Sequence, residues 1–105
     1  MTDEHSTVDQ LIAILENRLA SVAERDDAAM DLGEYDSPAA MRCLLRIASD
    51  PDESEMVQAS AGESLAMVWL RNGVFDPDTM RGLTATARQE VEGLVRRERP
   101  DWLMD

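Results

Sequence analysis

The stretch Ala28-Ala-Met-Asp-Leu-Gly33 returns 33 residues later as Ala61-Gly-Glu-Ser-Leu-Ala66, and this pair of segments predicts the fold. In both segments, small residues precede a leucine by one helical turn, and a glycine or alanine follows the leucine. Small residues let a neighbouring helix come close, and the leucine fills the space between the two helices. The repeat therefore predicts two equivalent helices in successive copies of one helical unit.

Capping-box patterns extend this helical reading on both sides of the repeat. They occur at Thr7-Val-Asp-Gln10, Ser21-Val-Ala-Glu24 and Thr86-Ala-Arg-Gln89, where a hydroxyl and a Glu or Gln side chain can satisfy free backbone N–H groups. Behind the first box, apolar residues follow the spacing of one buried helical face: Val8, Leu11, Ile12, Leu15 and Leu19. We therefore expect helices that begin near these three boxes.

Proline and glycine mark the remaining helix boundaries. Ser37-Pro38 predicts a helix start, because proline fits the first helical position, where no N–H group is needed. Asp50-Pro51-Asp52 predicts a turn, after which the longest helix runs from near Ser54 to Gly73. Asp76-Pro77 predicts a short capped helix or turn, and Pro100 ends the last helix. Short connections of this kind make sequential helices antiparallel neighbours.

The unit built from these helices resembles bacterial HEAT-like repeats. Residues 25–34 look like the first helix of such a unit, residues 37–48 like the second, and residues 50–69 like the start of the next unit. The resemblance is best over residues 21–72, whereas residues 73–86 depart from the tight turn of the pattern. It implies an all-α stack of antiparallel helical hairpins, an α-solenoid of five to six helices, whose curved surface binds partners.

Composition agrees with one all-α domain over residues 1–105. Ala, Leu, Met and Val dominate the 44% of hydrophobic residues, and aromatic residues make up only 4% of the chain. Alanine and unbranched side chains favour helices, while the β-branched and aromatic residues typical of strands are scarce. We expect Trp69 to lie in the core and Trp102 to fold back onto the last helix.

The N-terminal segment and the single cysteine predict a cytoplasmic protein. Residues 1–6 are acidic, lead into no apolar core of signal-peptide type, and are expected to be frayed. No stretch approaches the length of a transmembrane helix. One cysteine, Cys43, cannot form an intramolecular disulfide, so a reducing compartment suits the chain.

The charge of the chain is strongly negative. Twenty-two acidic residues face ten basic ones, all of them arginine, which gives a net charge of −12. Residues 1–80 hold 17 acidic residues and five arginines, whereas residues 81–105 are neutral as a group. Such a field repels nucleic acid and anionic lipid, so we expect neither to be a partner. It would attract a basic protein, although an acidic surface also serves solubility alone.

Residues suited to catalysis or metal binding are few. One histidine, His5, and one cysteine cannot supply the three or four N or S ligands of a zinc site. Cys43 falls beside an apolar stripe, where a buried small side chain is the expected role. The acidic turn at residues 50–55 lacks the glycine and the final glutamate of a calcium loop. We expect no catalytic residue, no metal and no cofactor.

The acidic residues instead predict a surface for binding a protein. The predicted contact set joins carboxylates of the second helix and of the 50–55 turn to a loop tyrosine: Asp27, Asp31, Glu34, Tyr35, Asp36, Asp50, Asp52, Glu53 and Glu55. Small acidic helical-repeat proteins are similar in character to bacterial immunity proteins and antitoxins. That analogy implies a protein that neutralises a basic toxin, for instance a nuclease. Solvated helix faces would explain the same carboxylates without any partner.

Two other functions stay open at the level of the sequence. A general adaptor or assembly module would dock a peptide or a subunit on the helical stack without inhibiting it. An enzyme accessory of the bilin-lyase kind shares HEAT-like repeats, but it needs a chromophore pocket for which this chain is short.

Overall fold

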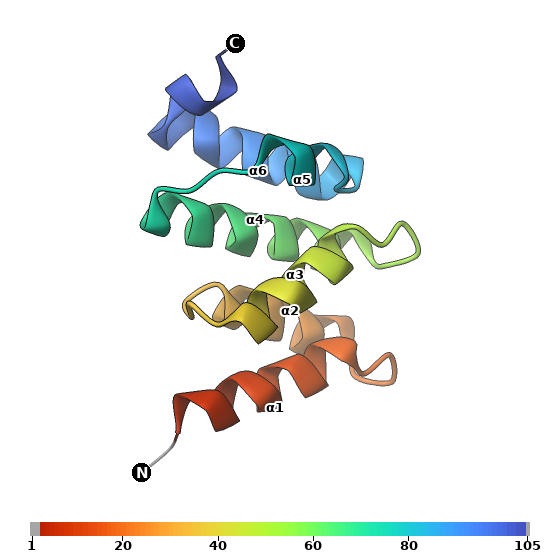
Figure 1. Ribbon diagram of the computed structural model, residues 1–105. Coiled ribbons are helices and arrows are strands. Elements are labelled where there is room, and N and C mark those ends of the chain that lie inside the picture. The colour runs from red at the N-terminus through yellow and green to blue at the C-terminus, as the bar shows by residue number, and fades with distance from the viewer. Residues whose placement is uncertain (1–2, 105) are drawn as a thin grey trace.

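The computed structural model describes residues 3–104, which form six α-helices and a terminal 3-10 helix without any strand (Figure 1). The prediction of an all-α protein is therefore confirmed. None of the helices within these residues has the length and hydropathy that crossing a bilayer requires. The elements are α1 (Glu4–Glu16), α2 (Val22–Leu32), α3 (Pro38–Ala48), α4 (Glu55–Asn72), α5 (Pro77–Arg81), α6 (Ala85–Glu98) and η1 (Pro100–Leu103).

Side-chain caps place several helix starts where the sequence predicts them. The Ser21 hydroxyl accepts a hydrogen bond from the Glu24 N–H, and Ser37 and Asp76 cap α3 and α5 in the same way. Each cap satisfies a backbone N–H group that the first helical turn leaves free. The predicted end of α4 is also observed: Gly73, which follows the last helical residue, adopts a left-handed conformation with φ 67°, as a glycine that ends a helix commonly does.

Two predicted helix starts are wrong because a better-placed cap lies nearby. Asp3 caps α1, so residues 4–6 are helical and not frayed, and Thr7 lies inside the helix. Residues 1–2 of the segment predicted to be frayed lie outside the described residues. Thr84 caps α6 in place of Thr86, because its backbone N–H donates to the Ala48 carbonyl at 2.9 Å and fixes its position.

The end of α1 also differs from the prediction that Leu19 belongs to its buried face. The helix ends at Glu16, and the Asn17 side chain accepts a hydrogen bond from the Leu19 N–H at 3.0 Å. This contact draws the chain into a turn, which leaves the Leu19 side chain 95% exposed. The apolar spacing continues past the point where local hydrogen bonding ends the helix.

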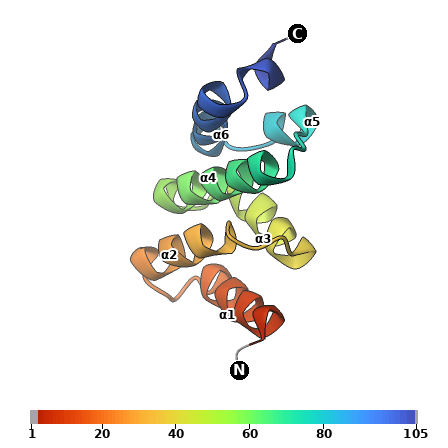
Figure 2. The ribbon, with the colours of Figure 1, turned by 90° about the vertical axis from the view of Figure 1, so that its left-hand side faces the viewer.

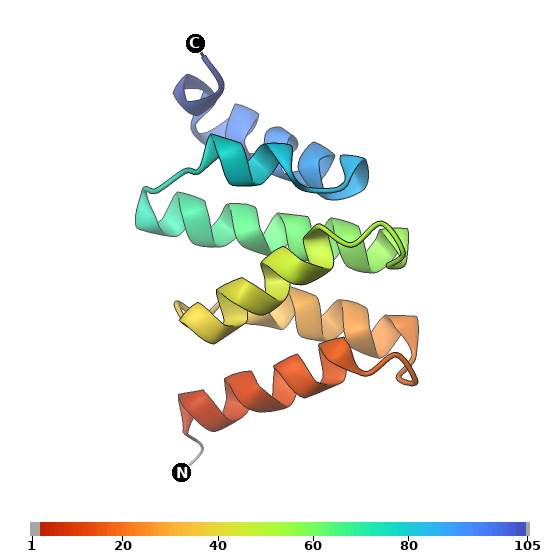
Figure 3. The same ribbon diagram turned by 45° about the vertical axis from the view of Figure 1, so that its right-hand side comes forward.

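The helices follow one another from the N-terminal end of the molecule to the C-terminal end, within 42 × 32 × 19 Å (Figure 2). α4 is the central helix and packs against α2, α3 and α6, while α3 crosses the side of α2 and α4 (Figure 3). α2 and α4 run in the same direction, because Asp26 meets Ser60 near their starts and the Gly33 carbonyl meets Arg71 near their ends.

The two copies of the repeat pack directly against each other. Ser64 of α4 donates a hydrogen bond to the Ala29 carbonyl of α2 at 2.6 Å, and Gly33 lies against the same serine. On the other side of α4, Gly62 touches the backbone of Ala87 in α6. The small residues of the repeat therefore let α4 approach both neighbours, and Leu32 and Leu65 fill the core with no exposed surface.

An aromatic cluster covers the C-terminal end of the core. The Trp102 ring stacks on Phe75 with a centroid separation of 5.2 Å, and Phe75 meets the edge of Trp69 at 5.5 Å. The Arg99 guanidinium lies 4.5 Å from the Trp102 ring centroid. The predictions that Trp69 is a core residue and that Trp102 folds back are both confirmed.

Replacing Trp102 with alanine should lower the free energy of unfolding by about 2 kcal/mol, because it removes the stack on Phe75 and the contact with Arg99. Urea unfolding followed by circular dichroism measures the change. Met104→Ala is the matched control, since Met104 lies two residues away and is 75% exposed. Equal stability of the two variants would show that the aromatic cluster does not hold the C-terminal segment.

Candidate functional site

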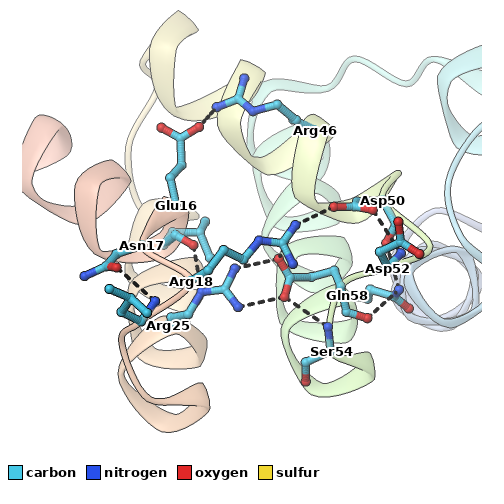
Figure 4. Close-up of polar contacts among 12 residues, drawn as sticks. Glu16, Asn17, Arg18, Arg25, Arg46, Asp50, Asp52, Ser54 and Gln58 are labelled. Atoms are coloured by element: carbon cyan, nitrogen blue, oxygen red, sulfur yellow. Dashed lines mark hydrogen bonds and ion pairs between the residues drawn. The ribbon is translucent and has the colours of Figure 1, made fainter.

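A buried ion pair joins α2 to the turn that precedes α4 (Figure 4). Arg25 and Glu53 are only 4% and 5% exposed, and their side chains meet in two parallel hydrogen bonds of 2.7 and 2.5 Å. The third nitrogen of the Arg25 guanidinium, Nε, donates to the Leu15 carbonyl at 2.9 Å near the end of α1. The bidentate hydrogen bonding between Arg25 and Glu53 is the strongest form of arginine–carboxylate pairing.

Further contacts complete the network around Glu53. Its carboxylate also accepts from the Ser54 N–H at 3.0 Å, and Gln58 donates to the backbone carbonyls of Asp50 and Glu53. Arg18 reaches Asp50 at 2.7 Å and lies 3.7 Å from Glu53. The hydrogen bonds from Arg25 hold the pKa of Glu53 below its usual value, although burial opposes this shift.

This network corrects part of the predicted contact set. Glu53 is buried and saturated with internal partners, so it cannot serve as a surface contact for a basic protein. Asp50 also has internal partners. Its carboxylate accepts hydrogen bonds from the Asp52 N–H and from Arg18, and both contacts lower its pKa. Asp52 and Glu55 remain exposed. The acidic run at residues 50–55 predicts a surface, whereas the turn folds around Glu53.

Arg25 was missed by the sequence reasoning, yet its spacing carries a signal. Residues 25, 28, 29 and 32 follow the i, i+3, i+4, i+7 pattern of the buried face of α2. An arginine on a buried face requires a carboxylate partner, because an unpaired buried charge is costly. That requirement points to an acidic residue elsewhere in the core, without saying which one.

The exposed acidic ridge, which comprises Asp27, Asp31 and Glu34, lies on and just after α2. Among residues 3–104 no arginine or histidine forms an ion pair with any of the three. Asp27 and Asp31 are one turn apart, a spacing at which like charges repel and weaken a helix. The ridge is therefore a concentration of negative charge that the described part of the fold leaves uncompensated.

Most arginines are engaged elsewhere in the described part of the chain. Apart from Arg42 and Arg96, each arginine lies within ion-pair distance of a carboxylate outside the ridge. Arg71 pairs with Asp36 at 2.7 Å, and this contact, with Asn72, lowers the pKa of Asp36. Asp36 stays exposed but is tied to the end of α4, so it differs from the unpaired ridge.

Tyr35 is half-buried and packs against the hydrophobic core. The predicted contact set gives this residue the role of a partner contact. The observed packing makes it a cover for the core, while its exposed part still lies between Glu34 and Asp36 in sequence. Tyr35 therefore follows the ridge directly in sequence, but its side chain is partly occupied by packing against the core.

A groove of about 730 Å³ lies between α4 and α6. Its floor is apolar and is formed by Met67 and Leu70 from α4 and by Leu94 from α6. Charged side chains border it: Glu63, Arg71, Arg97, Glu98 and Arg99. The sequence reasoning did not find this groove, because the residues come from two helices whose relative placement no single helical pattern specifies.

The single cysteine and the single histidine do not line the groove. Cys43 is 1% exposed, and burial raises its pKa to about 11, so the thiol is protonated at neutral pH. His5 is exposed near the start of α1, 3.8 Å from Asp9. Within residues 3–104, no three His, Cys, Asp or Glu side chains gather as a metal site would need.

Comparison of the chain with protein-family models, with curated proteins and with solved structures finds no match.

Proposed function

We propose that this chain is a protein-binding module whose acidic ridge receives a basic protein partner. The supporting observation is that Asp27, Asp31 and Glu34 are exposed and unpaired within residues 3–104. A carboxylate stripe that no internal cation balances weakens its own helix, so a basic partner would relieve a cost that folding alone leaves in place.

The architecture we propose for this module is a HEAT-like stack. The parallel course of α2 and α4 and the direct packing of the two repeat segments support this reading. Successive hairpins in such a stack place equivalent helices side by side and offer their outer surface to a partner. In that arrangement the ridge on α2 and the groove beside α4 belong to one layer of helices.

Within this class, we propose an immunity protein or antitoxin that neutralises a basic toxin, such as a nuclease, in the cytoplasm. The net charge of −12 supports charge-steered association, and an inhibitor of a nuclease benefits from negative charge that mimics the substrate's phosphates. Binding is favoured over catalysis because the ridge carboxylates stand on an exposed helix surface, whereas acid–base catalysis works best in a cleft that excludes water.

Neutralising the ridge is the direct test of this function. The tagged parent protein should capture a basic partner from native lysate. The triple variant Asp27→Asn, Asp31→Asn and Glu34→Gln should associate with that partner about tenfold more slowly than the parent does at low salt. The matched control neutralises three exposed carboxylates elsewhere, Glu4, Asp9 and Glu90, and changes the net charge equally. Mass spectrometry identifies the captured protein, and binding kinetics are measured with that purified protein.

The outcomes separate the two binding functions. A single basic protein that inhibits growth alone, and whose capture depends on the ridge and on salt, supports the inhibitor. Equal capture by both triple variants, or an acidic subunit held regardless of salt, contradicts the ridge proposal and favours the general adaptor.

A further inference from the structure

We propose that the groove between α4 and α6 binds a short amphipathic helix of the basic partner. This inference rests on the proposed function, and it names the structural element that the partner presents. The groove has an apolar floor, and it lies on α4, the helix that packs against α2.

The size of the groove fits about two turns of helix. Its lining on α4 runs from Glu63 to Arg71, which corresponds to about 12 Å along the helix axis. A bound helix of that length presents two or three side chains spaced at i and i+3 or i+4 to the floor. Met67 is 37% exposed, and a flexible methionine adapts its shape to such side chains.

The charges at the two ends of the groove give the bound helix a direction. Glu63 lies at one end, whereas Arg71, Arg97 and Arg99 lie toward the other together with one carboxylate, Glu98, so that end keeps a net positive charge. A helix carries partial positive charge at its N-terminus and partial negative charge at its C-terminus. The N-terminal end of the partner helix therefore fits beside Glu63, and its C-terminal carbonyls or a terminal carboxylate fit among the arginines.

The ion pairs of these arginines lie at the surface, while Arg71 also donates to the Gly33 carbonyl and Arg99 lies against the Trp102 ring. Their carboxylate partners are Asp36, Glu98 and Asp101, and in each pair both side chains are at least 37% exposed. Exposed pairs of this kind contribute little to stability, so a bound carboxylate can replace or share one of them. At the opposite end, Glu63 favours a lysine or arginine in the first turn of the bound helix.

Charge and shape disfavour two other occupants. A second copy of this chain would bring another net charge of −12 toward the ridge, at a cost in repulsion. An isolated acyl chain would leave much of its length in water, because the groove is open along the surface between two helices and is not an enclosed tunnel. A helix with one apolar stripe covers the floor and keeps its polar sides in solvent.

Two synthetic helical peptides of about twelve residues test the proposal. Both carry the same leucine stripe; the first has lysine in its first turn and glutamate in its last turn, and the second has these charges exchanged. Fluorescence anisotropy should give the first peptide an affinity at least about tenfold higher. With 13C-labelled methionine methyl groups, the Met67 signal should shift on binding while the Met104 signal stays in place.

A matched pair of variants locates the binding site. Met67→Glu should weaken binding of the first peptide at least about tenfold, because a carboxylate then stands on the apolar floor. Met104→Glu makes the same change at an exposed position outside the groove and should leave the affinity unchanged. Equal affinity of the two peptides, no shift at Met67, or a concentration-dependent dimer that Met67→Glu abolishes would overturn the proposal.

The results also distinguish failure of this inference from failure of the proposed function. If the Met67→Glu variant captures the basic partner as fast and as tightly as the parent, the groove proposal fails and the ridge proposal stands. If the ridge variant behaves as its control while Met67→Glu loses the first peptide, the groove proposal stands and the ridge proposal fails.

Discussion

Replacing Glu53 with alanine is expected to lower the free energy of unfolding by about 3–5 kcal/mol. The variant leaves the Arg25 guanidinium buried without its counter-ion, and it removes the acceptor of the Ser54 N–H as well. The same network ties the end of α1, the start of α2 and the turn before α4, so its loss acts on three helices at once. Urea unfolding at neutral pH measures the effect.

Two further variants isolate the buried charge as the cause. Glu16→Ala breaks a pair with Arg46 in which the side chains are 42% and 56% exposed, and it should cost less than about 1 kcal/mol. The double variant Arg25→Met, Glu53→Leu removes both charges and should recover most of the stability lost by Glu53→Ala. If Glu53→Ala lowers the free energy of unfolding no more than Glu16→Ala does, the Arg25–Glu53 pair does not organise the turn before α4.

The pair also gives stability a defined dependence on pH. The folded pKa of Glu53 lies below the value of about 4.3 in an unfolded chain, so its contribution is fully present above that value. It is lost progressively as the pH falls through the lowered, folded pKa. The parent should therefore lose more stability in this acidic range than the double variant Arg25→Met, Glu53→Leu, which has no carboxylate at this position.

Local patterns predicted most of the helices, because their signals lie within a few residues. The cap at Ser21 and the left-handed Gly73 depend only on neighbouring N–H and C=O groups. Predictions failed where two residues compete for one role, as Asp3 does with Thr7 and as Thr84 does with Thr86. A tertiary contact, from Thr84 to the Ala48 carbonyl, decides the second case and cannot be read from the local sequence.

The candidate site was predictable only in its exposed charges. Asp27 and Asp31 share a face at helical spacing, and the structure leaves both exposed. The fate of Glu53 depends on Arg25, which lies 28 residues away in sequence, and an acidic run does not reveal which member turns inward. The groove depends on how closely α4 and α6 approach, which is a property of packing and not of either helix alone.

Gly62→Ala is expected to destabilise the protein by about 2 kcal/mol, although alanine is the better helix former by about 1 kcal/mol. A Cβ atom at this position would lie 2.5 Å from the Ala87 carbonyl oxygen and 2.9 Å from its Cα atom. Both are backbone atoms of α6 and cannot turn aside as a flexible side chain would. The two helices must separate, and the close contact of Gly62 with Ala87 is lost.

Gly93→Ala provides the opposite expectation within the adjacent helix. Gly93 lies inside α6, and a Cβ atom there would meet nothing within 4 Å, so only the gain in helix propensity remains. This variant should be more stable than the parent by about 0.5–1 kcal/mol. Thermal and urea unfolding of both glycine variants should thus give shifts of opposite sign. Stabilisation by both would mean that α4 and α6 are less closely packed at Gly62 than their backbone contact indicates, and the floor of the groove would then be wider as well.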